Sequence, residues 1–111
     1  MRSYLVEEIN SQDMAKILDS ISQKALKRPV EGLYWMMVPQ DLLTDEQKAH
    51  AGQCGPHYMA VEVGDDWIKL ELLVRCEKII RCDCISYATN EQRETMINFI
   101  DQLIRNQDVR V

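Results

Sequence analysis

The sequence predicts an α+β fold: a two-layer sandwich in which N- and C-terminal helices pack on one face of a four-stranded, mostly antiparallel sheet. Residues 11–25 and 96–104 repeat apolar side chains at three- and four-residue steps, as amphipathic helices do. Residues 57–76 instead alternate apolar and polar side chains, as half-buried strands do. Gly64-Asp65 divides this alternating stretch and indicates a hairpin turn.

Length and composition bound the class of protein. A chain of 111 residues fits a single domain over residues 1–111, and 46% hydrophobic with 28% charged residues is typical of a globular protein. The net charge of -5 argues against nucleic acid as a partner, because phosphate binding needs clustered Lys and Arg.

Apolar runs are short throughout the chain. The first twenty residues lack the apolar core of an export signal, and no run approaches the roughly 20 residues that span a bilayer. We therefore expect a cytoplasmic protein with no membrane segment. In that compartment the four cysteines are expected to be thiols.

The N-terminal third is predicted to hold one helix and one strand. Residues 1–9 allow either a short strand or an irregular lead-in. The helix begins near Ser11, capped by Asn10 or Ser11 itself, and ends at Arg28-Pro29, since the residue before proline is disfavoured in a helix. Residues 30–38 are rich in β-branched and aromatic side chains and predict a strand with cover on both faces.

Two capping-box spacings mark helix starts. Thr44 and Gln47 predict two helical turns that end at Gly52, within an otherwise irregular segment, residues 40–56. A connection this long is either a binding loop or a surface crossover, and we favour the crossover. Thr89 and Gln92 predict the start of the last helix.

The hairpins set which side chains share a face. A two-residue Gly64-Asp65 turn places Val61 opposite Ile68. The next hairpin has two candidate registers. We favour the one that places Cys76 opposite Cys82, because it also pairs opposite charges across the strands.

These registers gather four possible metal ligands at one end of the sheet. They are Cys54, His57, Cys76 and Cys82, and thiolates with imidazole form the ligand set of tetrahedral zinc sites. The spacing is unlike that of a standard zinc knuckle, and free cysteines often pack as small apolar residues. The sequence therefore favours core thiols and no cofactor. A zinc site and a Cys76–Cys82 disulfide stay open as alternatives.

Cys54 could also be a nucleophile activated by His57, three residues further on. The sequence supplies neither a third orienting group nor an oxyanion site. We therefore predict no catalytic residues and expect a protein that is not an enzyme.

The outer sheet face carries the stronger argument for function. Aromatic and apolar side chains among charges resemble the composition of a protein interface, and two helices would cover only the inner face. We expect a non-enzymatic binding protein that holds a protein partner or forms a homodimer, with a thiol or zinc protein as the alternative. The predicted binding residues are Tyr58, Trp67, Leu73, Ile85 and Tyr87.

Overall fold

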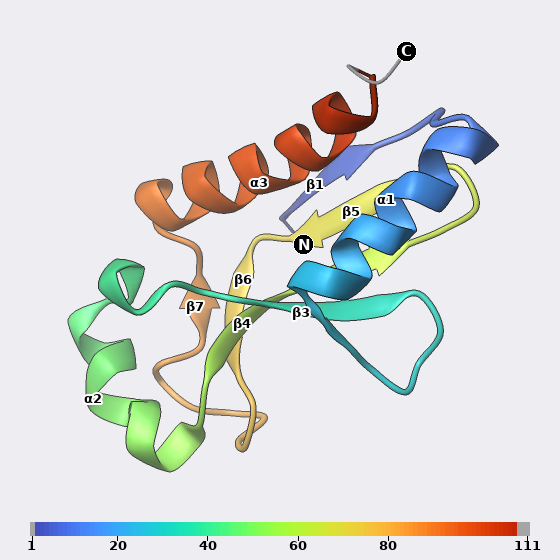
Figure 1. Ribbon diagram of the computed structural model, residues 1–111. Helices are drawn as coiled ribbons and strands as arrows, with labels where there is room; N and C mark the ends of the chain where they lie inside the picture. Colours follow the sequence, from blue (N-terminus) through green and yellow to red (C-terminus); the bar gives the residue numbers. More distant parts are fainter. Residues whose placement is uncertain (1, 109–111) are drawn as a thin grey trace.

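A computed structural model gives the structure of residues 2–108. It contains three α-helices, one short 3-10 helix and an antiparallel sheet of seven strands, so the predicted α+β class is confirmed (Figure 1). The elements in chain order are β1 (Ser3–Val6), α1 (Ser11–Lys24), β2 (Leu26–Lys27), β3 (Leu33–Met37), η1 (Gln40–Leu42), α2 (Asp45–Cys54), β4 (His57–Val63), β5 (Ile68–Glu71), β6 (Leu73–Cys76), β7 (Ser86–Tyr87) and α3 (Asn90–Asp108).

The sheet has more strands than the expected four because the long central strand is divided into β5 and β6, and because β1 and β2 add one strand at each end of the main order. The main order is β1-β5-β4-β3-β2, while β6 pairs with β4 and β7. At Leu72 the strand passes from β1 to β7 along the same edge. The Leu72 N–H donates to the Arg2 carbonyl at 3.0 Å, and the Leu72 carbonyl accepts from the Ala88 N–H at 3.0 Å.

The first hairpin is offset by two residues from its predicted register. Val61 pairs with Leu70, so the turn spans residues 64–67 and does not consist of two residues. The Trp67 indole lies so close to Gly64 that a Cβ added there would be 2.1 Å from the ring. A shift of two residues leaves every side chain on its original face, so the division into inner and outer faces holds.

Both registers considered for the second hairpin are wrong. Leu73 pairs with Tyr87 and Val74 with Ser86, which places residues 77–85 in a loop. Cys82 is therefore not the partner of Cys76 across a strand pair. The neighbour of Cys76 on the other side is His57 of β4.

The first helix and first long strand are shorter than predicted. α1 begins after its Asn10 cap, as expected, but ends at Lys24 rather than at Arg28-Pro29. Leu26 and Lys27 form β2 and pair with Trp35 and Tyr34. This early hairpin with β3 takes the residues before the proline out of the helix.

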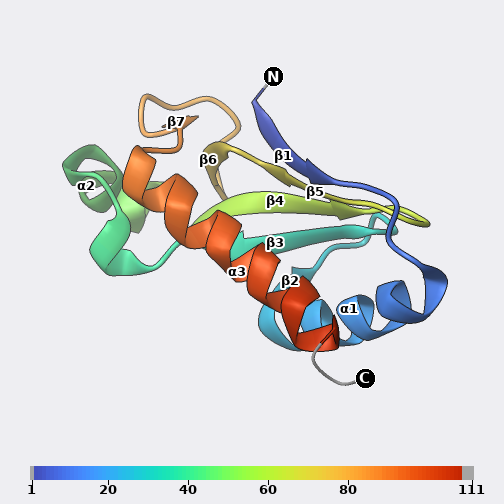
Figure 2. The same ribbon diagram turned by 90° about the horizontal axis from the view of Figure 1, so that it is seen from above.

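One cluster of buried apolar side chains joins α1 and α3 to the inner face of the sheet. Figure 2 shows α3 crossing the strands, with α1 beside it. The buried members are Ile17, Ile21, Tyr34, Met36, Val38, Met59, Val61, Ile68, Leu70, Leu72, Val74, Met96, Ile100 and Leu103. None of the helices within residues 2–108 is long and apolar enough to cross a membrane.

Candidate metal centre

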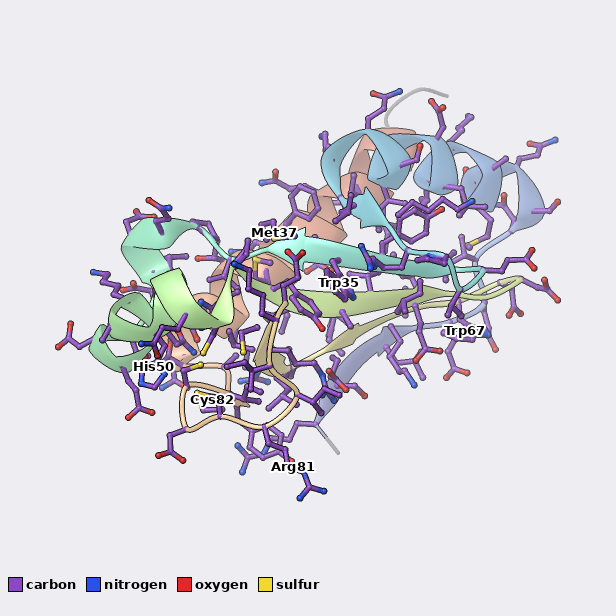
Figure 3. The ribbon with its side chains drawn as sticks, turned by 90° about the horizontal axis from the view of Figure 1, so that it is seen from below. Trp35, Met37, His50, Trp67, Arg81 and Cys82 are labelled. Carbon is purple, nitrogen blue, oxygen red and sulfur yellow. The ribbon has the colours of Figure 1, made fainter. Side chains whose placement is uncertain are left out.

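The end of α2 and the 77–85 loop bring four possible metal ligands together. His50 and Cys54 lie one turn apart on α2, so their side chains share a face of the helix. Cys82 and Cys84 come from the loop, where the Ile85 N–H donates to the Cys82 carbonyl and closes a turn. The ligand atoms of all four residues lie within 4.8 Å of one another. Figure 3 shows His50 and Cys82 facing each other at this end of the molecule.

Three of the six donor separations are close to those of a tetrahedral centre. His50 Nδ1 lies 3.1 Å from Cys82 Sγ and 3.8 Å from Cys54 Sγ, and the two sulfurs are 3.6 Å apart. Tetrahedral zinc with Zn–S bonds of about 2.3 Å separates two sulfurs by roughly 3.8 Å and a sulfur from a nitrogen by roughly 3.5 Å. One ion could therefore contact these three donors after shifts of a few tenths of an ångström, and Cys84 Sγ, within 4.8 Å of them, after a shift of up to about 1 Å.

A buried glutamine connects this cluster to both nearby helix starts. The predicted capping boxes at Thr44–Gln47 and Thr89–Gln92 are both present. Gln47 Oε1 also accepts from Gln92 Nε2 at 3.0 Å, and Gln47 Nε2 donates to the Cys84 carbonyl at 3.4 Å. The side chain that caps α2 thus also holds the backbone of a candidate ligand.

Backbone hydrogen bonds tie the loop to the end of α2. The Lys78 N–H donates to the Cys54 carbonyl at 2.8 Å, and the Glu77 N–H donates to the Pro56 carbonyl at 3.1 Å. Gly55 ends the helix with φ of 84°, and a Cβ at this position would approach the Lys78 side chain to 3.2 Å. Glycine therefore permits both the helix end and the close approach of the loop.

The thiols differ in how readily they ionise. A backbone hydrogen bond from Cys84 is the main cause that lowers the pKa of Cys82 to about 7. Burial raises the pKa of Cys54 and the pKa of Cys84. Cys82 is therefore the first thiolate of the cluster, and a bound cation would promote ionisation of the other two.

The structure unites two of the four ligands that the sequence suggested. Cys54 and Cys82 belong to the cluster, but His57 and Cys76 are replaced by His50 and Cys84. The Cys76 thiol donates to the Ile79 carbonyl at 3.2 Å.

His57 is only 3% exposed, and neither of its ring nitrogens has a hydrogen-bond partner. Burial lowers the pKa of His57, which keeps the imidazole neutral. The suggested His57–Cys54 nucleophile pair also lacks support, because no hydrogen bond links the two side chains among residues 2–108.

The missed ligands each carried a signal in the sequence. His50 and Cys54 are four residues apart, which is one helical turn. The predicted helix ended at Gly52, before Cys54, so this spacing was not seen as helical. Cys82 and Cys84 form a Cys-x-Cys pair, which reads as one face of a strand until the segment is known to be a loop.

The predicted binding residues lie in three parts of the molecule: on neighbouring strands β4, β6 and β7, in the turn before β5, and beside the cysteines. Tyr58 is on the outer face, where its ring stacks on Trp35 at 3.8 Å, and the Arg28 guanidinium lies 3.9 Å above the Trp35 ring. Trp67 lies in the turn at the far end of the sheet (Figure 3). Ile85 packs against the cysteine cluster.

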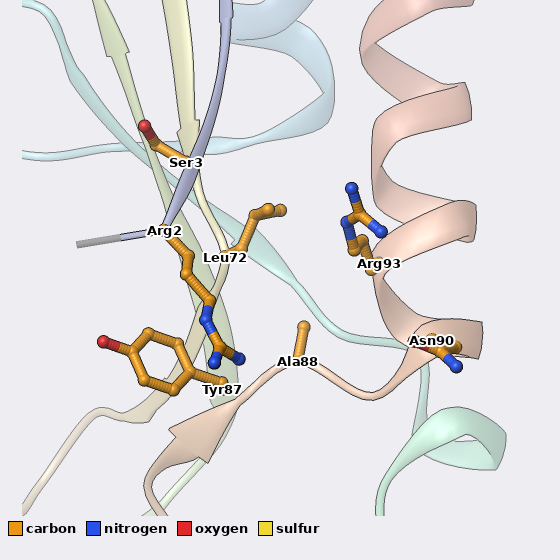
Figure 4. A pocket seen from close by; sticks show the side chains of 7 residues that line it. All are labelled: Arg2, Ser3, Leu72, Tyr87, Ala88, Asn90 and Arg93. Carbon is orange, nitrogen blue, oxygen red and sulfur yellow. The ribbon is translucent and has the colours of Figure 1, made fainter.

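Leu73 and Tyr87 pair across β6 and β7, and β6 is also the neighbour of β4, where Tyr58 pairs with Arg75. Tyr87 is 46% exposed, and the Arg2 guanidinium lies 4.3 Å from its ring centre. Tyr87 also lines a hollow of about 490 Å³ with Arg2 and Arg93, near the start of α3 (Figure 4). The two guanidinium groups point in different directions there, so they do not form one anion clamp.

Comparison of this chain with protein-family models, curated proteins and solved structures gave no match.

Proposed function

We propose that this protein binds one Zn²⁺ ion through His50 Nδ1 and the sulfurs of Cys54, Cys82 and Cys84. The observation that supports this most directly is the convergence of the four donor atoms within 4.8 Å of one another. The donors come from two separate segments: His50 and Cys54 from the C-terminal half of α2, and Cys82 and Cys84 from the 77–85 loop.

The chemistry of the donors favours zinc. Three thiolates and one imidazole are a known ligand set of structural zinc sites, whereas calcium and magnesium prefer oxygen donors. Four protein donors fill a tetrahedral shell and leave no open position for water or substrate. The proposed ion therefore has a structural role.

The structural role proposed for the ion is to hold α2 in place. In α2 only Gln47 and Cys54 are buried, so this helix has little apolar surface to hold it on the sheet. A zinc ion would join the last turn of α2 to the 77–85 loop with bonds that apolar packing does not provide.

The first experiment measures metal in the purified protein and in protein reloaded with Zn²⁺ or Co²⁺. We expect one ion per chain, and for Co²⁺ the intense visible absorption of tetrahedral coordination together with thiolate charge-transfer bands. A protein that takes up no zinc at neutral pH under reducing conditions would refute the proposal.

The variants test which residues hold the ion. His50→Gln and Cys84→Ser should weaken zinc binding by at least about 100-fold, because each removes a proposed ligand. His57→Leu and Cys76→Ser are matched controls at the same end of the sheet that lie outside the proposed ligand set, and both should bind one ion as before. If the control variants lost zinc and the His50→Gln and Cys84→Ser variants kept it, the proposed ligands would be wrong.

We also propose the outer sheet face as a homodimer interface, as a second candidate function. The centre of this face is the Arg28–Trp35–Tyr58 stack, and Leu26 and Met37 beside it are 47% and 41% exposed. In the part of the chain that the structure describes, no helix crosses this face (Figure 3).

The charges on this face suit a second copy of the chain. It carries both signs, with Lys69 near Glu62 at 3.7 Å and Arg75 bonded to Glu71 at 2.8 Å. Two copies related by a two-fold axis can exchange such pairs across the interface.

Sedimentation of the protein over a range of concentrations tests the dimer. We expect a dimer that Leu26→Glu and Met37→Glu each shift toward monomer, by roughly tenfold or more in dissociation constant. Ile80→Glu is the control, because Ile80 is an exposed apolar residue outside this face. A chain that stays monomeric at high concentration would exclude this candidate.

A further inference from the structure

The four cysteines lie as two neighbouring pairs. Cys54 and Cys82 have their sulfurs 3.6 Å apart, and Cys76 and Cys84 have theirs 3.9 Å apart. We propose that peroxide converts these pairs into two disulfides and thereby releases the metal, with Cys76 as the non-ligand thiol that completes the second pair. This inference rests on the proposed zinc site.

The position of Cys76 suits a disulfide with Cys84. Cys76 is the last residue of β6, and Cys84 lies two residues before β7, the strand that pairs with β6. The sulfurs are already in van der Waals contact, so side-chain rotation with a small backbone adjustment could close the bond.

Exposure of the sulfurs gives the order of events. Cys82 is only partly buried and lines an open hollow of about 430 Å³ with Ile80 and Arg81. The other three cysteines are 4% exposed or less. An oxidant from solvent therefore meets Cys82 first.

The first disulfide forms in two steps. The Cys82 thiolate attacks hydrogen peroxide, the O–O bond breaks, and the sulfur becomes a sulfenic acid with release of hydroxide. The Cys54 thiolate then attacks that sulfur, the S–O bond breaks with loss of a second hydroxide, and the S–S bond forms. Two electrons have passed from two thiolates to one peroxide.

Loss of two ligands frees the metal and exposes the second pair. A second peroxide oxidises Cys84 to a sulfenic acid, and Cys76 attacks it to form the Cys76–Cys84 disulfide. The proton of the Cys76 thiol leaves with the oxygen as water. Without Cys76 the three ligand thiols are odd in number, and one of them would stay unpaired.

Peroxide titration of the zinc-loaded protein tests this scheme, with released zinc followed by a chromogenic chelator and the products by mass spectrometry. We expect complete zinc release at about one peroxide per ion, loss of all four thiols at about two, a final mass lower by about 4 Da, and full recovery of zinc binding after reduction. Peptide mapping should find Cys54–Cys82 and Cys76–Cys84. Protein oxidised in denaturant should give mixed pairings, since four cysteines allow three connectivities.

Cys76→Ser is the informative variant because it leaves all four proposed ligands in place. It should bind zinc as the original protein does, lose only about 2 Da on oxidation, and keep one thiol that forms intermolecular disulfides or oxidises further. A Cys82–Cys84 disulfide with Cys76 left free in the folded protein would overturn the inference.

Failure of the zinc proposal can be told apart from failure of this one. If the protein takes up no metal, the same mapping on the folded metal-free chain still tests the pairing. If the protein takes up metal but Cys76 stays reduced, the zinc site stands and the redox inference fails.

Discussion

The two ends of this molecule hold their helices in different ways. At one end α1 and α3 contribute large aliphatic side chains to a shared core with the inner sheet face. At the other end, α2 and the 77–85 loop meet around a small cluster of Cys54, Cys76 and Cys84. The first end folds by burial of apolar surface, whereas the second depends on polar contacts and sulfur.

This difference explains why the candidate metal centre lies where it does. Burial of a large aliphatic side chain stabilises a fold by about 1.5–3 kcal/mol, and α2 has no buried aliphatic residue. Its capping box and the buried Gln47 contacts fix its start, but its last turn rests on sulfur contacts. A metal ion would stabilise the packing of α2, as the apolar core stabilises the packing of α1 and α3.

The largest effect is expected from breaking the apolar end. Ile100 of α3 is 1% exposed within the main core, so Ile100→Ala should lower the free energy of unfolding by about 3–4 kcal/mol. Urea denaturation should show the same loss with and without a chelator, because the site is remote from the cysteines. Ile80→Ala, at an 87% exposed position, is the control and should change stability by less than about 0.5 kcal/mol.

Removal of zinc should act on the other end alone. At a free zinc concentration about 100 times the dissociation constant, the ion stabilises the bound state by about 2.7 kcal/mol. Chelation should therefore speed hydrogen exchange in α2 and residues 77–85 while the amides of α1 and α3 keep their protection. Uniformly faster exchange over the whole chain would show that the two ends are not separable.

A smaller effect is expected from the glutamine that connects α2 to α3. Gln47→Leu leaves the Thr44 N–H and the Cys84 carbonyl without their Gln47 partner and removes one of the two hydrogen bonds of the Gln92 amide nitrogen. It should destabilise the protein by about 2 kcal/mol. The variant should also bind zinc less tightly, since it loosens Cys84. Gln53→Leu on the same helix is exposed and serves as the control in urea denaturation and zinc titration. Equal losses of stability and zinc affinity in the Gln47→Leu and Gln53→Leu variants would show that the Gln47 hydrogen bonds do not support the site.

Local signals predicted the helix starts well. The capping boxes at Thr44 and Thr89 and the Asn10 cap depend only on residues three positions apart, so the sequence contains them in full. The inner and outer faces were also predictable, because an error of two residues in register does not move a side chain to the other face.

Features that depend on competition between distant segments were not predictable. β1 and β7 share one edge of the central strand and meet at Leu72, more than sixty positions from the start of β1. The Gly64 turn is lengthened by the packing of Trp67 on its backbone. The predicted registers brought Cys54 and Cys82 to the same end of the sheet although those registers were wrong, whereas His50 needed the true end of α2 and Cys84 needed the loop.

The smallest effect concerns His57, which the sequence suggested as a ligand and the structure places beside the candidate centre without a hydrogen bond. Its pKa is lowered from 6.5 by burial, so the unfolded chain takes up a proton at a pH where the folded chain does not. The folded state therefore loses stability as the pH falls below about 7. His57→Leu should remove this part of the loss.

The measurement is urea denaturation of both zinc-loaded chains at pH 8 and pH 6. At pH 8 the variant should differ by less than about 1 kcal/mol, because leucine fills the site and removes two unpartnered nitrogens. Between pH 8 and pH 6 the original protein should lose more stability than His57→Leu. The ion site is common to both chains, so its own pH dependence cancels in the difference. An equal change in the free energy of unfolding between pH 8 and pH 6 in both chains would mean that the His57 ring has a hydrogen-bond partner or contacts water in solution.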